Sequence, residues 1–156
     1  MMKSIFKIIA KKDLKICLFE SASAGYIAYK ISQDQYSGDI LDGGIVCYDL
    51  NFKKKLFKIK QSIIDEHTAE SPEVTKQLIM NGKNIYKSDI YISCTGLLKR
   101  GGSETKQKPV GTFFYCIFYK NTYYQFEIMT KGHPKAKLRT LYKNICKSLK
   151  IILKNG

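Results

Sequence analysis

The amino-acid sequence predicts an α/β fold, a three-layer α/β/α sandwich built on a mixed sheet of about five strands. Short apolar runs alternate with segments of helical periodicity, which is typical of a sheet covered by helices on both faces. Asn121-Thr122 separates two apolar runs and indicates a hairpin, which adds an antiparallel edge. With 156 residues, of which 44% are hydrophobic, the chain has the size and composition of one domain over residues 1–156.

In the first half of the chain, small residues at 21–25 form the most distinctive segment. They follow an apolar run and precede a helical pattern that opens at Tyr26, so the backbone there can approach a ligand closely. Upstream, Ile5, Ile8 and Ile9 recur at helical spacing between lysines and predict an amphipathic first helix. The other elements expected here are a strand over 14–20, a polar loop over 37–42, a strand over 43–49 and a basic helix over 51–59.

In the second half, the clearest helix start is Ser71-Pro72-Glu73. Serine is a favoured N-cap, proline suits the first helical position, and an acid suits the first turn. Apolar residues continue this helix to about residue 87. The remaining elements expected are a strand over 89–96, a charged loop over 97–109, strands over 110–119 and 123–130, and a final amphipathic helix containing Leu138, Leu141, Ile145, Leu149 and Ile152.

The net charge of +14 restricts the partners that the chain is expected to bind. Arg100 and Arg139 are the only arginines, and specific base recognition favours arginine over lysine, so no specific nucleic-acid partner is predicted. Nonspecific attraction to polyanions stays open, and the charge favours anionic substrates. No apolar run approaches the roughly 18 residues of a membrane span, and the N-terminus lacks the long apolar region of a signal peptide. A cytoplasmic protein without a membrane partner is therefore expected.

The cysteines predict packing instead of metal binding. No CxxC pair and no Cys/His cluster of ligand spacing occurs, so no zinc site is predicted. Scattered cysteines in a cytosolic chain are usually small, buried apolar side chains. This expectation applies to Cys17, Cys47, Cys94, Cys116 and Cys146.

Three predicted strands end in polar loops, at residues 20–25, 48–53 and 95–103. In open α/β sheets, ligands bind at the loops that leave the carboxyl ends of the strands. The residues alone leave structural alternatives open. A serine in such a turn is more often an N-cap than a nucleophile, and the lysine run at 53–55 is usually a solvated helix face.

Five segments of the chain match a known pattern in order. Residues 20–25 are similar to E-S-(C/A)-T-G-G, and residues 43–53 to G-G-x-V-x-Y-(x4)-K. Residues 69–74 are similar to A-V-S-E-E-V, residues 95–112 to T-G-I-A-G-P-x-G-G…K-P-V-G-T, and Gly132 with Arg139 to part of G-D-R-x-x-V-R-R. Together they resemble the CinA C-terminal family of stand-alone nicotinamide mononucleotide deamidases, over nearly the whole chain.

The resemblance implies a Ser–Lys amidohydrolase that converts nicotinamide mononucleotide to nicotinate mononucleotide and ammonia, without a cofactor and as a homo-oligomer. It implies that Ser21 is the nucleophile, Lys53 its base and Tyr48 an orienting group. A lysine can act as a base only if its pKa falls far below about 10.4, which burial and neighbouring cations favour. The substrate-binding residues implied are Glu20, Ser23, Gly25, Thr95, Gly96, Gly101, Gly102, Ser103 and Arg139.

Two departures from the family pattern leave a second hypothesis. The family's A-G-P becomes Leu98-Lys99-Arg100, which puts two long cations where a close backbone approach is expected. The D-R pair after Gly132 becomes His133-Pro134, which removes a charge pair. A nucleotide-binding or interaction module of the same fold, without turnover, is therefore the alternative to an active enzyme.

Overall fold

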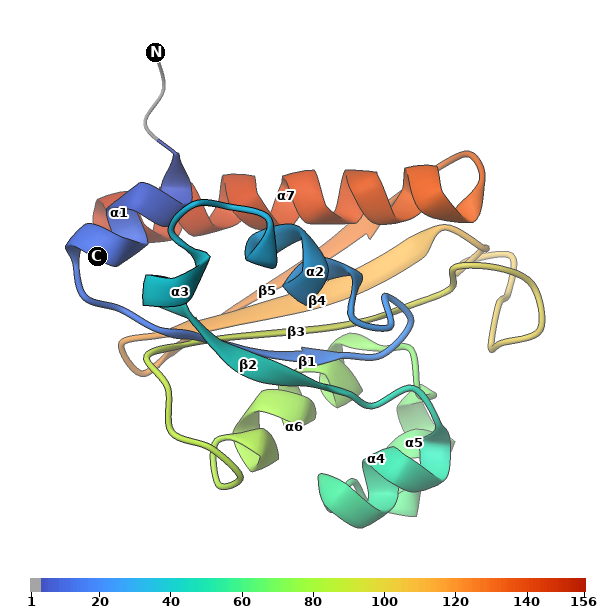
Figure 1. Cartoon of the computed structure of the whole chain (residues 1–156). Helices are drawn as coiled ribbons and strands as arrows, with labels where there is room; N and C mark the ends of the chain where they lie inside the picture. Colours follow the sequence, from blue (N-terminus) through green and yellow to red (C-terminus); the bar gives the residue numbers. More distant parts are fainter. Residues whose placement is uncertain (1–3) are drawn as a thin grey trace.

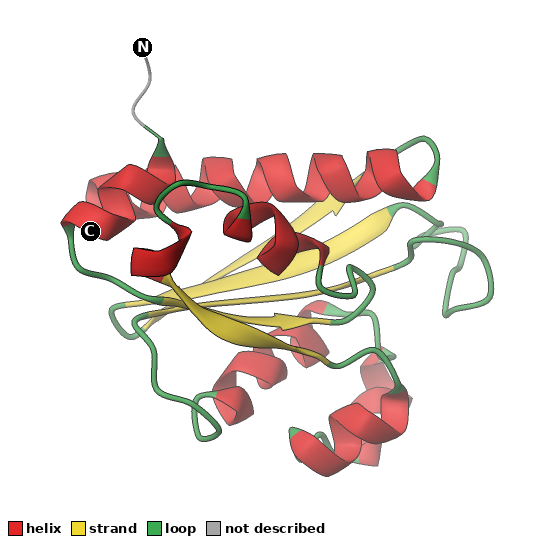
Figure 2. Cartoon of the chain, viewed as in Figure 1, coloured by secondary structure: helices red, strands yellow, loops and turns green. Residues whose placement is uncertain are grey.

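The computed structural model describes residues 4–156, which form a five-stranded sheet with helices on both faces (Figures 1 and 2). The strands are β1 (Ile16–Glu20), β2 (Leu41–Val46), β3 (Ile90–Gly96), β4 (Thr112–Tyr119) and β5 (Thr122–Met129). The helices are α1 (Ile5–Lys11), α2 (Tyr26–Ser32), α3 (Ser37–Ile40), α4 (Leu50–Leu56), α5 (Gln61–His67), α6 (Pro72–Gly82) and α7 (Pro134–Asn155).

The sheet is mixed, with the strand order β2-β1-β3-β4-β5. β1 pairs in parallel with both β2 and β3, whereas β4 runs antiparallel to β3 and β5 antiparallel to β4. The predicted α/β class and the hairpin edge are confirmed. Because β1, β2 and β3 are parallel, their carboxyl ends lie at the same edge of the sheet.

The helices form two layers. α1, α2, α3 and α7 cover one face of the sheet, and α4, α5 and α6 cover the other (Figure 1). Successive residues of a strand point to opposite faces, so Leu18 of β1 enters the core beneath α1 and α7. Its neighbour Phe19 enters the second core, where its ring lies 5.1 Å from that of Phe57. The predicted three-layer sandwich is confirmed.

Two local caps fix helices near the carboxyl edge of the sheet. Ser71 is the N-cap of α6, as predicted: its hydroxyl accepts a hydrogen bond from Val74 N at 3.2 Å, and Pro72 takes the first helical position. Asp49 caps α4 in the same way by accepting a hydrogen bond from Asn51 N at 2.9 Å. These caps satisfy N–H groups that have no partner within the helix.

Several predicted boundaries are wrong. The segment 37–42 contains α3 and the start of β2, not a loop, and α5 was not predicted. β2 ends at Val46 because the chain turns toward the N-cap of α4, so Tyr48 lies in a loop. α6 ends at Gly82, not near residue 87. A Cβ on that glycine would lie 2.4 Å from the ring of Phe19.

The cysteines lie where the sequence predicts. Cys17, Cys47, Cys94 and Cys116 are buried, and Cys146 is half-buried. Desolvation raises the pKa of the Cys47 thiol to about 11, which makes a reactive thiolate unfavourable at neutral pH. Over residues 4–156, the helices include none that is long and apolar enough to cross a membrane.

Candidate active site

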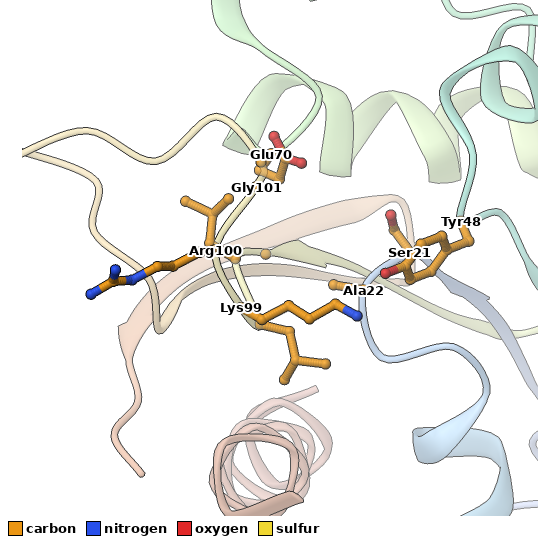
Figure 3. Close-up of a pocket in the computed structure, with 11 residues that line it drawn as sticks. Ser21, Ala22, Tyr48, Glu70, Lys99, Arg100 and Gly101 are labelled. Atoms are coloured by element: carbon orange, nitrogen blue, oxygen red, sulfur yellow. The ribbon is translucent and has the colours of Figure 1, made fainter. Parts of the chain in front are cut away.

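A pocket of about 210 Å³ lies at the carboxyl edge of the parallel strands (Figure 3). It collects residues from the loops after β1, β2 and β3, which are the three loops that the sequence points to. Its lining residues are Ser21, Ala22, Tyr48, Glu70, Gly96, Leu97, Leu98, Lys99, Arg100, Gly101 and Gly102.

Ser21 is the first residue after β1, and its backbone is fixed on both sides. Its N–H donates to Cys94 O of β3 at 3.1 Å, and its carbonyl accepts from Ala24 N at 3.0 Å. The side chain is only 7% exposed, yet it lines the pocket. Among residues 4–156 the Ser21 hydroxyl has no hydrogen-bond partner. A hydroxyl that opens into a pocket without a partner in the protein is available to a ligand.

The backbone beside Ser21 carries two further free donors. In the described chain, neither Ala22 N–H nor Ser23 N–H donates to another group. Both amides belong to the tight turn between β1 and α2, which the hydrogen bonds around Ser21 hold in place. Paired backbone N–H groups next to a hydroxyl are the donors that an oxyanion hole requires.

Glu20 holds this turn and does not line the pocket. It is buried, and its carboxylate accepts from Ile27 N at 2.9 Å, Ala28 N at 3.0 Å and Ser23 Oγ at 2.7 Å. A carboxylate is favourable at the N-terminus of α2, where N–H groups lack partners. Ser23 Oγ also lies 3.0 Å from Cys94 Sγ. Glu20 and Ser23 therefore support the Ser21 turn from inside.

Gly25 completes the same turn. Its φ of +92° lies in the left-handed region, where glycine is favoured, and it precedes the first residue of α2. A Cβ there would lie 3.5 Å from Val46 Cγ2 of β2, so the strain would come from the backbone and not from crowding. Its contribution to the site is the direction in which the chain enters α2.

Lys53 lies on α4 and is only 2% exposed. Its Nζ donates to Tyr48 O at 2.8 Å. Desolvation lowers the pKa of Lys53 below its usual 10.5, and the nearby Cys47, Glu70 and Asp49 act in the opposite direction. Lys53 is thus a buried amine behind the pocket wall, and no hydrogen bond joins it to Ser21 among the described residues.

Tyr48 connects this lysine to the pocket. Its carbonyl binds Lys53, while its side chain lines the pocket and is 56% exposed. Figure 3 shows the Tyr48 ring beside Ser21, at one end of the pocket. Ser21 and Tyr48 therefore line the same pocket, and Lys53 contacts this group through the Tyr48 carbonyl.

Thr95 and Gly96 end β3 behind the pocket. Thr95 is fully buried, and its hydroxyl lies 2.9 Å from that of Thr75 on α6, so it ties β3 to the helix layer. Gly96 lines the pocket. A Cβ at Gly96 would lie 2.2 Å from the Phe113 ring, so glycine is required there for packing.

The loop after β3 contributes most of the remaining wall. Gly101 and Gly102 line the pocket, and their N–H groups donate to the Glu104 carboxylate at 2.9 Å each. Ser103 donates from Oγ to Glu70 Oε2 at 2.5 Å. Lys108 Nζ donates to Glu70 O at 2.8 Å and so anchors the loop to the start of α6.

The two cations of this loop point in different directions. Figure 3 shows the Lys99 ammonium directed toward Ala22 and Ser21, whereas the Arg100 guanidinium points away from them. Both line the pocket. Lys99 thus brings a positive charge toward the hydroxyl end of the pocket.

Arg139 is the expected site residue that lies apart from this arrangement. It is exposed on α7 and does not line the pocket. Two residues earlier on the same helix, Lys137 faces inward: it is buried and donates to Leu98 O at 2.8 Å, so α7 contacts the loop through a lysine. Sequence reasoning missed Lys137, Glu70 and Glu104. The only signal for Glu70 was its place beside the Ser71 N-cap.

No group of three or more His, Cys, Asp or Glu side chains that could hold a metal ion occurs within residues 4–156. The groups that line the pocket or lie next to it are the Ser21 hydroxyl, backbone N–H donors, the cations Lys99 and Arg100, and the buried amine of Lys53 behind Tyr48.

Comparisons with known proteins agree with this architecture. A model of the CinA C-terminal domain family matches residues 1–152. Protein MG115 of Mycoplasma genitalium is 25% identical over 146 residues, covering 93% of this chain and 92% of that protein. A crystal structure of a CinA superfamily protein from Klebsiella pneumoniae superposes with a TM-score of 0.90 at 16% identity, covering 98% of this chain and 95% of that one.

Other relatives are much longer. One from Caldanaerobacter subterraneus subsp. tengcongensis, whose name refers to competence-damage induction, is 29% identical over 136 residues. The match covers 87% of this chain but 32% of that protein, so the chain spans about a third of its length.

Proposed function

Because the chain belongs to the CinA C-terminal domain family, we propose that it is an amidohydrolase that converts nicotinamide mononucleotide to nicotinate mononucleotide and ammonia. The observation that carries the proposal is the free Ser21 hydroxyl in the pocket, flanked by the unpaired N–H groups of Ala22 and Ser23. A hydroxyl with two adjacent amide donors suits attack on a carboxamide.

In the proposed first step, Ser21 Oγ attacks the carboxamide carbon and transfers its proton to Lys53 Nζ. The carbonyl oxygen becomes an oxyanion, which the Ala22 and Ser23 N–H groups stabilise. The C–N bond then breaks as the leaving nitrogen takes the proton from Lys53, which releases ammonia and leaves an ester on Ser21. Water attacks this ester with Lys53 again as the base, and the product acid and free Ser21 result.

Lys53 suits the role of base because desolvation lowers its pKa. Its present hydrogen bond is to Tyr48 O, so proton transfer from Ser21 requires a side-chain rotation or one bridging water. Catalytic hydrogen bonds are often formed only in the substrate complex, and this geometry is compatible with the role.

The other expected site residues take supporting roles in this proposal. Glu20, Ser23, Gly25 and Thr95 position the turn and the strand end, and Tyr48 orients the carboxamide. Gly96, Gly101, Gly102 and Ser103 form or brace the wall that the nucleotide contacts. We assign no contact to Arg139, because it lies outside the pocket. Self-association and a cytoplasmic location stay predictions.

One observation favours the alternative of a binding module without turnover. The Lys99 ammonium points toward Ser21 and Ala22, in a pocket smaller than the roughly 300 Å³ typical of small-molecule sites. A lysine in that position can pair with an anionic group of a bound nucleotide while it crowds the carboxamide.

The two functions differ in whether product forms. We expect the wild-type protein to bind nicotinamide mononucleotide saturably and to accumulate nicotinate mononucleotide, measured by chromatography. Ser21→Ala should bind the substrate and form at most about a thousandth of the product. Ser32→Ala, which changes an exposed serine on α2, should match wild type. Saturable binding with no product from wild type would identify the binding module instead.

A further inference from the structure

The glycine pair of the pocket loop already binds an anion, and that anion is part of the chain. Gly101 N–H donates to Glu104 Oε1 and Gly102 N–H to Glu104 Oε2, both at 2.9 Å. Gly101 has a φ of +103°, a conformation that glycine adopts readily. Two successive amides directed at both oxygens of one carboxylate form an anion-binding nest.

The charges around the nest also favour an anion. The hydrogen bond from Gly101 N–H lowers the pKa of Glu104 most, and the Arg100 guanidinium acts in the same direction. Lys99 adds a second cation to the same loop. The nest therefore combines two neutral donors with nearby positive charge, which is the chemistry that phosphate groups select.

One carboxylate opposes this preference. A Cβ on Gly102 would lie 3.5 Å from both Glu70 Oε1 and Glu104 Oε2, so the two acids flank that glycine. Glu70 Oε2 is bound by Ser103 Oγ. The two amides nevertheless hold the Glu104 carboxylate beside that of Glu70. A negative charge is therefore tolerated at this position even with a second carboxylate nearby.

We propose that Glu104 is an internal substitute for a ligand's phosphate group, and that a phosphate monoester displaces it from the Gly101 and Gly102 amides. A phosphate offers three oxygens and up to two charges, so it can bind both amides and Arg100 at once. Glu104 then acts as a tethered competitor that weakens phosphate binding and raises the KM for a phosphorylated substrate.

Gly101 and Gly102 line the same pocket as Ser21, whereas Glu104 is not among its lining residues (Figure 3). In this proposal, a ligand whose phosphate replaces the Glu104 carboxylate extends along the loop into the pocket that Ser21 lines. Naming that ligand a pyridine mononucleotide rests on the proposed function, whereas phosphate binding at the nest does not.

The direct test is calorimetric titration of inorganic phosphate into wild type, Glu104→Ala and Glu127→Ala. Glu127 is an exposed acid on β5 outside this pocket, so its loss changes the net charge equally without freeing the nest. We expect Glu104→Ala to bind phosphate at least about tenfold more tightly than either of the other proteins. Adding Arg100→Gln to Glu104→Ala should remove most of that gain.

Equal or weaker phosphate binding by Glu104→Ala, compared with Glu127→Ala, would overturn the inference, with thermal unfolding confirming that both variants are folded. Titrations with nicotinamide mononucleotide and nicotinamide riboside distinguish the sources of the phosphate. Only the phosphorylated ligand should gain affinity in Glu104→Ala. If Glu104→Ala binds phosphate more tightly but wild type releases no ammonia, only the deamidase proposal is contradicted. If wild type is active but Glu104→Ala has an unchanged phosphate affinity, only this inference is contradicted.

Discussion

Lys53 shows how burial can prepare a single residue for chemistry. An exposed lysine stays protonated near neutral pH and cannot accept a proton from a hydroxyl. Lys53 is 2% exposed, and desolvation disfavours its charged form. The acids Glu70 and Asp49 limit the decrease of its pKa. Burial therefore raises the fraction of Lys53 that is neutral at a given pH, and only the neutral amine can accept a proton.

This environment predicts the pH dependence of the reaction. Lys53 must be neutral to act as the base, so ammonia release should rise about tenfold per pH unit below its lowered pKa and level off above it, at a pH below 10.5. Lys53→Arg, whose guanidinium stays charged, should be inactive throughout. The measurement is kcat/KM for nicotinamide mononucleotide across this range. A wild-type profile that is flat or falls with pH would contradict the role of Lys53.

The candidate site residues could be predicted from the sequence only where a local motif marks them. Ser21 follows a strand and opens a small-residue turn, and Lys53 follows Tyr48 at a fixed spacing. Lys137 and Glu104 carry no such signal, because their contacts with Leu98 and with Gly101 depend on how the 97–111 loop folds. The buried state of Lys53 was likewise hidden within a run of three lysines.

At the element scale, the last residue of β3, Gly96, must be a glycine because there is no room for a side chain. Phe113 of β4 is fully buried and paired with Gly96 across the antiparallel ladder, and a Cβ would meet its ring at 2.2 Å. β3 also leads into the pocket loop, and Gly96 itself lines the pocket. Packing of two strands and the shape of the pocket are therefore linked.

Gly96→Ala should lower the free energy of unfolding by about 1–3 kcal/mol, since it overpacks a fully buried contact. Gly38→Ala is the matched control. A Cβ at that glycine of α3 would meet nothing within 4 Å, so this change should be neutral or slightly stabilising. Urea denaturation of both variants measures the difference. Equal stabilities would show that the Phe113 ring can move aside freely.

A helix or strand could be predicted where its own residues determine it. A boundary could not be predicted where contacts with a distant element accompany it. The α6 start at Ser71 depends on its cap and was predicted correctly. At the other end of α6, Gly82 packs against Phe19, a residue far away in the sequence, and no local pattern predicts that contact. The short α3 has no helical periodicity of its own, and its one buried residue, Ile40, packs in a core built by other segments.

At the scale of the whole molecule, the topology explains why the candidate site lies where it does. Parallel pairing of β1 with β2 and β3 brings three loops to one edge, and these loops hold Ser21, Tyr48 and the glycine pair. The alternation of strands and helices predicts this arrangement from the sequence. The strand order itself requires the long-range pairing of β1 with β3, which no local pattern reveals.

The most direct test of the proposed Ser–Lys chemistry is ammonia release from nicotinamide mononucleotide, with wild type and Lys53→Ala side by side and no added metal. We predict steady release by wild type and a loss of at least about a hundredfold in Lys53→Ala, with both proteins folded. No ammonia release from folded wild type, or equal release by the two proteins, would contradict the proposed Ser–Lys chemistry.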